Sequence, residues 1–162
     1  MRRWFRFLLG TLTVMAVIGL SALLTLWAVA RSRGVIRVSI PGASIIETKS
    51  QSADYSDAYR MTIRSDLFRD SGSLDRFAFQ KGARIGATLQ EIVYTGNSPG
   101  LRYYISYLVR HVGSESNITV STIVHYHTWK GQLYFTNIKP VHRVLTPFMV
   151  SIMVRNAEDA DA

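Results

Sequence analysis

A single uncharged stretch near the start of the chain limits what this sequence can fold into. It runs from Phe7 to Ala30, FLLGTLTVMAVIGLSALLTLWAVA, and has 24 residues without a charged side chain. At about 1.5 Å per residue, a helix of this length extends roughly 36 Å, more than the bilayer core of about 30 Å. Trp4 and Trp27 lie near its ends, where indole rings favour the membrane interface. We therefore predict a single-pass membrane anchor over residues 1–33.

A cleaved signal peptide is the alternative interpretation, because Ala28-Val29-Ala30 resembles a cleavage site. Signal peptides usually have shorter apolar cores of about 7–15 residues, so the length favours an uncleaved anchor. Arginines flank the stretch on both sides, which leaves the positive-inside count almost balanced. Since short basic N-termini usually stay in the cytoplasm, we expect the folded domain on the periplasmic or outer side of the membrane.

The charge of the chain belongs largely to this anchor. The net charge is +8, but from Val35 onward 14 Lys and Arg residues face 11 Asp and Glu residues. Nucleic-acid binding needs clustered cations on a folded surface, so we expect no nucleic-acid partner. The chain has no cysteine, which excludes disulfides, thiolate catalysis and cysteine-ligated zinc.

Residues 34–52 read as a strand followed by a linker, residues 53–157 as the folded domain, and residues 158–162 as a frayed acidic tail. Val35 to Ile40 alternates apolar and polar residues and predicts a first strand, whereas Glu47 to Ser56 is polar and predicts a loop. Asp54 and Asp57 could form an acid–base pair. Strand alternation separates them, however, so we expect two solvated carboxylates at a strand entry.

Four segments then predict successive antiparallel strands joined by short turns. Residues 66–81 leave room for one brief helix before them. The odd positions from Leu101 to Val109 form a continuous apolar and aromatic face. The four expected strands are Arg84–Tyr94 with Ile85, Ala87, Leu89 and Val93 on one face, Leu101–Val109, Ile118–Thr128, and Gln132–Ile138 after a turn at Lys130-Gly131.

A helix is expected from Pro140 onward, since proline is favoured in a first helical turn. Pro147 should kink it. Apolar residues at helical spacing predict a face that packs against the sheet, namely Val141, Val144, Leu145, Phe148 and Ile152. The predicted fold class is therefore α+β, with a transmembrane helix, an antiparallel meander sheet and a C-terminal helix.

His125 and His127 are candidates for a metal or catalytic pair, because alternate strand residues point to the same side. A metal site needs at least a third ligand at matching spacing, and neither His111, His142 nor a carboxylate supplies one. Ser121 shares their face without a nucleophile-elbow motif. We expect a polar strand face, with no metal, no cofactor and no catalytic residue.

Two stretches resemble a bacterial protein family, domain-of-unknown-function family 2867. They are ADYSDAYRMTI, Ala53–Ile63, and TVSTIVHYHTWKGQLYFTNIKPVHRVL, Thr119–Leu145, and with a weaker match between them the resemblance covers about residues 53–157. The order of elements also resembles the helix-grip fold of the Bet v 1, START and polyketide-cyclase superfamily. The resemblance implies a domain sometimes fused behind a dehydrogenase-like NAD-binding domain, but this chain has no Gly-rich nucleotide loop.

Two non-catalytic functions remain open. The domain could bind a hydrophobic or lipid-like molecule, or it could be a small structural subunit that docks on a membrane protein complex. A buried tyrosine hydroxyl without a partner costs about 1–3 kcal/mol, so several tyrosines on one concave face suggest a partly wet cavity. A core whose hydroxyls reach the rim is the alternative. The hypothetical ligand-binding residues are Tyr103, Tyr107, Tyr126 and Phe148.

Overall fold

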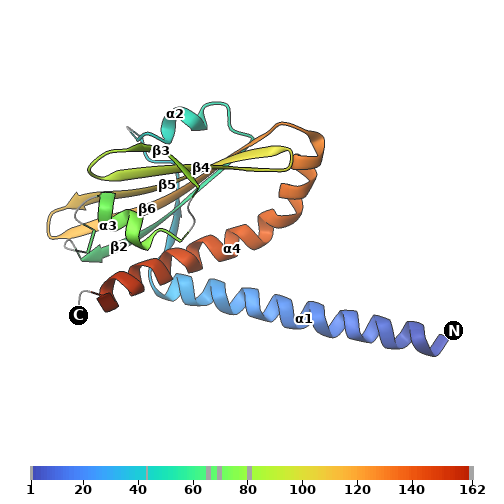
Figure 1. Ribbon diagram of the computed structural model, residues 1–162. Coiled ribbons are helices and arrows are strands. Elements are labelled where there is room, and N and C mark those ends of the chain that lie inside the picture. Colours follow the sequence, from blue (N-terminus) through green and yellow to red (C-terminus); the bar gives the residue numbers. More distant parts are fainter. Residues whose placement is uncertain (1, 43, 65–66, 69–70, 80–81, 161–162) are drawn as a thin grey trace.

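The computed structural model describes residues 2–160 except 43, 65–66, 69–70 and 80–81. One six-stranded antiparallel sheet forms its centre, in the spatial order β1-β2-β6-β5-β4-β3. The strands are β1 (Ile36–Val38), β2 (Tyr55–Arg64), β3 (Ala83–Ala87), β4 (Glu91–Ser98), β5 (Leu101–Val112) and β6 (Glu115–Tyr126). A meander is present as predicted, but β3, β4, β5 and β6 form it, and β2 adds to its β6 edge (Figure 1).

Helix α4 (Trp129–Ala160) covers one face of this sheet (Figure 1). The short helix α3 (Ser71–Phe77) lies on the same side and contributes Leu74 to the core. The predicted apolar positions of β5 do face this side, because Tyr103, Ile105 and Tyr107 pair across the strands with Val124, Thr122 and Val120. The predicted fold class is confirmed: a meander sheet packs around a long C-terminal helix.

The opposite face of the sheet is covered in part by the segment before β2. This segment contains a helical turn, α2 (Glu47–Ser50), where the polar composition predicted only a loop. The carboxylate of Glu91, which is buried in the sheet, accepts hydrogen bonds from the backbone N–H groups of Ile45 and Ile46 at 2.6 and 3.3 Å. These long-range hydrogen bonds hold the segment on the sheet, and no local sequence pattern predicts them.

The predicted strand Arg84–Tyr94 is wrong, since a tight hairpin divides it into β3 and β4. The hydroxyl of Thr88 accepts hydrogen bonds from the N–H groups of Gln90 and Glu91 at 3.3 and 3.0 Å, and this closes the turn. Ile85 and Leu89 are consequently exposed rather than part of one buried face. Hydroxyl side chains can close such turns by accepting backbone hydrogen bonds. Thr88 was therefore a turn signal, but the alternating pattern around it favoured a continuous strand.

The predicted turn at Lys130-Gly131 and the strand Gln132–Ile138 are also wrong, because α4 already begins at Trp129. Gly131 lies directly against Gly100, and a β-carbon at Gly131 would overlap the carbonyl oxygen of Gly100. The contact places the start of the helix beside the turn between β4 and β5. Pro140 and Pro147 therefore lie inside α4, which curves before it runs along the sheet (Figure 1).

The buried face of α4 is shifted from the predicted one. Val141 and Leu145 are partly exposed, whereas the helix buries Gly131, Phe135, Thr146, Pro147, Val150, Ser151, Met153, Val154 and Ala157. The shift arises because α4 packs against two partners, the sheet and the first helix. The helix also continues to Ala160, so most of the expected frayed tail is helical, and residues 161–162 lie outside the described part.

Helix α1 (Arg2–Ser32) projects away from the sheet, and its C-terminal part packs against α4 (Figure 1). Ala30 is 1% exposed and joins the main core together with Val35. The segment Met15–Ser32 is long and apolar enough to cross a membrane, and most of it is exposed. A signal sequence meets the same criterion, and Met15–Ser32 is the one candidate span among the described residues.

Candidate ligand-binding cleft

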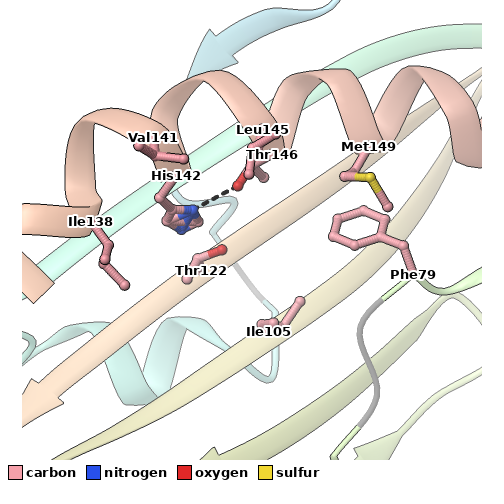
Figure 2. Close-up of a pocket in the computed structure, with 9 residues that line it drawn as sticks. All are labelled: Phe79, Ile105, Thr122, Ile138, Val141, His142, Leu145, Thr146 and Met149. Atoms are coloured by element: carbon pink, nitrogen blue, oxygen red, sulfur yellow. Dashed lines mark hydrogen bonds between the residues drawn. The ribbon is translucent and has the colours of Figure 1, made fainter. Parts of the chain in front are cut away.

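A cleft lies between the concave face of the sheet and α4. It consists of two adjoining hollows of about 390 and 200 Å³, which share the lining residues Ile105, Thr122, Ile138 and His142. Figure 2 shows the larger hollow, with Ile138, Val141 and Leu145 on the helix side and Ile105 on the sheet side. Both hollows are open to the surface and mostly apolar in their lining.

The polar groups of the cleft gather where α4 crosses β6. His142 and Thr122 line both hollows, and Thr146 lines the larger one. The Nδ1 atom of His142 lies 2.7 Å from the hydroxyl oxygen of Thr146, one helical turn further along α4 (Figure 2). Two residues four apart on a helix share a face, so this bond fixes the imidazole beside the apolar walls.

Behind these groups lies Asp57, whose side chain is fully buried. Asp57 is opposite Thr122 in the β2–β6 register. The hydroxyl of Tyr55 donates a 2.5 Å hydrogen bond to its Oδ2 atom, whereas Oδ1 has no hydrogen-bond partner among the described residues and lies 4.0 Å from Nε2 of His142. The prediction that both aspartates are solvated is therefore wrong for Asp57. It holds for Asp54, which is exposed and accepts a bond from the N–H of Tyr126.

Burial dominates the electrostatics of this cluster. Desolvation lowers the pKa of His142 below its ordinary value of 6.5, and the neighbouring Asp57 carboxylate opposes the shift without reversing it. Desolvation likewise raises the pKa of the Tyr55 and Tyr59 phenols, and Asp57 adds to the rise in both. The imidazole is thus neutral at neutral pH and offers one nitrogen acceptor and one N–H donor.

The cleft therefore offers a bound molecule only a few kinds of contact. Apolar walls would hold a hydrocarbon body, while the Thr122 hydroxyl and the neutral imidazole of His142 could bond one polar group. Asp57 is buried next to Thr122 and His142 and does not line either hollow. Among the described residues, no three His, Asp or Glu side chains gather closely enough to hold a metal ion.

The structure brings only part of the predicted ligand-binding set to this cleft. Tyr103 lines the smaller hollow. Tyr107 is completely buried between Phe79 and Tyr94, with ring centroids 5.5 and 6.1 Å away, and lines neither hollow. The remaining two predicted residues, Tyr126 and Phe148, are half-buried and pack against Phe135 and the main core respectively.

Sequence reasoning missed His142, Thr146 and Asp57. In the sequence, His142 supplies no third ligand to His125 and His127, and its place in the cleft depends on how α4 lies across the sheet. A usable signal was present, since Asp57 lies between Tyr55 and Tyr59 on one face of a strand, where a carboxylate among aromatic side chains needs partners. Those partners come from β2 itself and from α4, far away in the sequence.

His125 and His127 lie on the opposite side of the sheet from the cleft. The Nε2 atom of His125 lies 3.0 Å from the carbonyl oxygen of Lys49 in α2, and its ring packs perpendicular to that of Tyr104 with the ring centroids 5.7 Å apart. Both histidines border a polar hollow of about 480 Å³. The polar strand face was thus correctly predicted, although α2 and not solvent alone covers His125.

A meander sheet wrapped on one face around a long C-terminal helix, with a cleft between the two, is the helix-grip arrangement. The family described as "Protein of unknown function (DUF2867)" matches residues 87–149, which extend from the end of β3 to the middle of α4. This match confirms the resemblance noted in Thr119–Leu145.

No curated protein matches the chain. Among solved structures, the crystal structure of CalU16 from Micromonospora echinospora is similar at 10% identity, covering 78% of this chain and 90% of that chain with a TM-score of 0.25. At so low a score, the fold assignment rests on the strand order and on the position of α4.

Proposed function

We propose that this chain is a membrane-anchored, non-catalytic domain that binds a hydrophobic or lipid-like molecule in the cleft between the sheet and α4. The observation that carries the proposal is an open, mostly apolar cleft that contains only a few polar groups. Sites for small molecules have this composition, with apolar walls for affinity and isolated polar groups for orientation.

The size of the cleft supports a slender guest. Its larger hollow of about 390 Å³ falls within the range of about 300–1,000 Å³ typical of ligand pockets. The smaller hollow continues it past Ile138 and His142 toward Tyr103. An elongated chain lying across both hollows would pass His142, which could bond a hydroxyl or carbonyl group of the guest.

The position of α1 beside the cleft favours a ligand that comes from the membrane. The last turn of α1 packs on α4, and α4 is also the helix that forms one wall of the cleft. If α1 spans the bilayer, the cleft stays close to the membrane surface, where lipid-like molecules are concentrated.

Native mass spectrometry of the detergent-purified, full-length protein with added oleate tests the proposal. Ile138 lines both hollows from a partly exposed position, so Ile138→Trp should fill the cleft without unfolding the domain. We expect oleate occupancy to fall at least about fivefold, because each 1.4 kcal/mol of lost contact is a tenfold loss of affinity. Leu133→Trp is the matched control, since Leu133 lies on the same helix and outside the cleft. Equal occupancy in the three proteins would refute the proposal.

A docking subunit is the second candidate, and the start of α4 favours it. Trp129 and Leu133 are 68% and 54% exposed there, outside the cleft. Large exposed apolar side chains are common at protein interfaces. A protein subunit that remains bound in the same spectra, and that Trp129→Glu releases while Ile138→Trp does not, would favour docking over ligand binding.

A further inference from the structure

A further hollow, of about 430 Å³, lies where the anchor meets the folded domain. It is bordered by the end of α1, by β1, by β2 and by α4, and three of its lining residues are arginines: Arg31, Arg37 and Arg143. We call it the junction pocket. It is distinct from the cleft, since the two share no lining residue.

The three arginines that line the junction pocket come from three different elements, and the guanidinium carbon of Arg143 lies 6.0 Å from the ring centroid of Tyr55. Arg37 is opposite Tyr59 in the β1–β2 register, and the hydroxyl of Tyr59 donates a 3.3 Å hydrogen bond to the backbone carbonyl of Arg143. Arg31 is held over the ring of Trp27, with its guanidinium carbon 5.2 Å from the ring centroid. The packing of β1 and α4 on β2 thus brings together charges that are far apart in the sequence.

This positive charge is not neutralised within the described part of the protein. None of the residues that line the junction pocket is acidic, and no described carboxylate lies within ion-pair distance of Arg31, Arg37 or Arg143. All three arginines are exposed. Like charges around a hollow repel one another, and a bound anion relieves this repulsion.

The location of the junction pocket indicates which kind of anion it would bind. This step rests on the proposed membrane anchor: Arg31 directly follows the apolar stretch that ends at Ala30, so an α1 that spans the bilayer places it where the bilayer core gives way to the headgroups. Guanidinium groups bind phosphate oxygens through paired N–H donors, and basic pockets beside membrane helices bind anionic headgroups. We propose that the junction pocket binds a phosphate group through Arg37 and Arg143, with Arg31 as a third cation.

The phosphate could belong to an anionic lipid headgroup or to a free phosphate ion, and two measurements separate these sources. In native mass spectrometry, the full-length protein should retain phosphatidylglycerol at least about fivefold better than phosphatidylcholine if the lipid is the source. In equilibrium dialysis, labelled inorganic phosphate should bind if the free ion is the source. Either result supports the site only when binding is lost in Arg37→Gln/Arg143→Gln.

The matched control is Arg64→Gln/Arg84→Gln, which removes the same charge from exposed positions outside the junction pocket. Thermal melting of both double variants should match that of the wild type, because all four side chains are exposed. Equal lipid and phosphate binding in the wild type and in Arg37→Gln/Arg143→Gln overturns the proposal, and so does an equal loss in the control. Ile138→Trp should leave this binding intact, which separates the junction pocket from the proposed function of the cleft.

Discussion

The Nε2 atom of His142 in α4 lies 4.0 Å from the Oδ1 atom of Asp57 in β2, beneath the cleft. The carboxylate is fully buried, and its other oxygen accepts a hydrogen bond from the Tyr55 hydroxyl. A buried carboxylate is costly unless hydrogen bonds or a positive charge compensate it. The stability of the domain should therefore depend on contacts of α4, the same helix that forms one wall of the cleft.

Replacing Asp57 should reveal the importance of its bond to Tyr55. Asp57→Ala leaves the buried Tyr55 hydroxyl without this acceptor, which costs about 1–3 kcal/mol. For a chain of this size each kcal/mol lowers the melting temperature by about 2–4 °C. Asp57→Asn keeps an acceptor oxygen and should lose less. Circular dichroism melting in detergent measures both variants, and equal losses for Asn and Ala would contradict the role of the bond.

The stability of the domain should depend on pH through His142. Its folded pKa lies below the ordinary value of 6.5, so between these two values the unfolded chain binds a proton that the folded protein does not. Protonation then favours unfolding, and the free energy of unfolding should fall as the pH drops below about 6.5. Each unit by which the pKa is lowered corresponds to about 1.4 kcal/mol.

The control for this pH dependence is a second histidine. His142→Gln should flatten the decline in chemical unfolding measured between neutral and mildly acidic pH. His127→Gln should leave the decline unchanged, because His127 is exposed. An identical pH profile for the wild type and His142→Gln would show that another group titrates in this range.

The contact between Gly131 and Gly100 should be sensitive to a single methyl group. Alanine ordinarily stabilises a helix relative to glycine by about 1 kcal/mol. At Gly131 its β-carbon would overlap the carbonyl oxygen of Gly100, and overpacking of this kind typically costs about 1–3 kcal/mol. We expect Gly131→Ala to lower the melting temperature. Gly42→Ala is the control, since its β-carbon would meet only Glu47 Oε1 at 3.8 Å.

The first helix should remain attached to the protein in cells. Cleavage after Ala30 would cut within α1 at a residue that is buried in the core. We expect the full-length chain to stay in the membrane fraction after alkaline carbonate extraction, and N-terminal sequencing to find no chain that starts at Arg31. Release into the supernatant, or a mature N-terminus at Arg31, would identify the apolar stretch as a signal peptide.

Local periodicity was enough to predict the anchor-like helix, the long strands and the face of the sheet that meets α4. The odd positions of β5 illustrate this, because each residue in a strand points to the side opposite its neighbour. The same method failed at Gln132–Ile138, where a short apolar pattern fits a strand or a helix equally well. In the structure this segment is part of a helix. Gly131, near the start of that helix, contacts Gly100 on a turn about thirty positions earlier in the chain.

The order of residues was sufficient to predict which segments are apolar, which alternate, and that the charge is concentrated around the anchor. The crossing of the elements was needed to show that Asp57 meets His142, and that Arg37 and Arg143 lie beside Arg31. The physical reason is that hydrophobic periodicity reports how one element is buried, whereas a polar site depends on how several elements cross. Crossing is set by side-chain packing between residues that are distant in the chain, which no local pattern records.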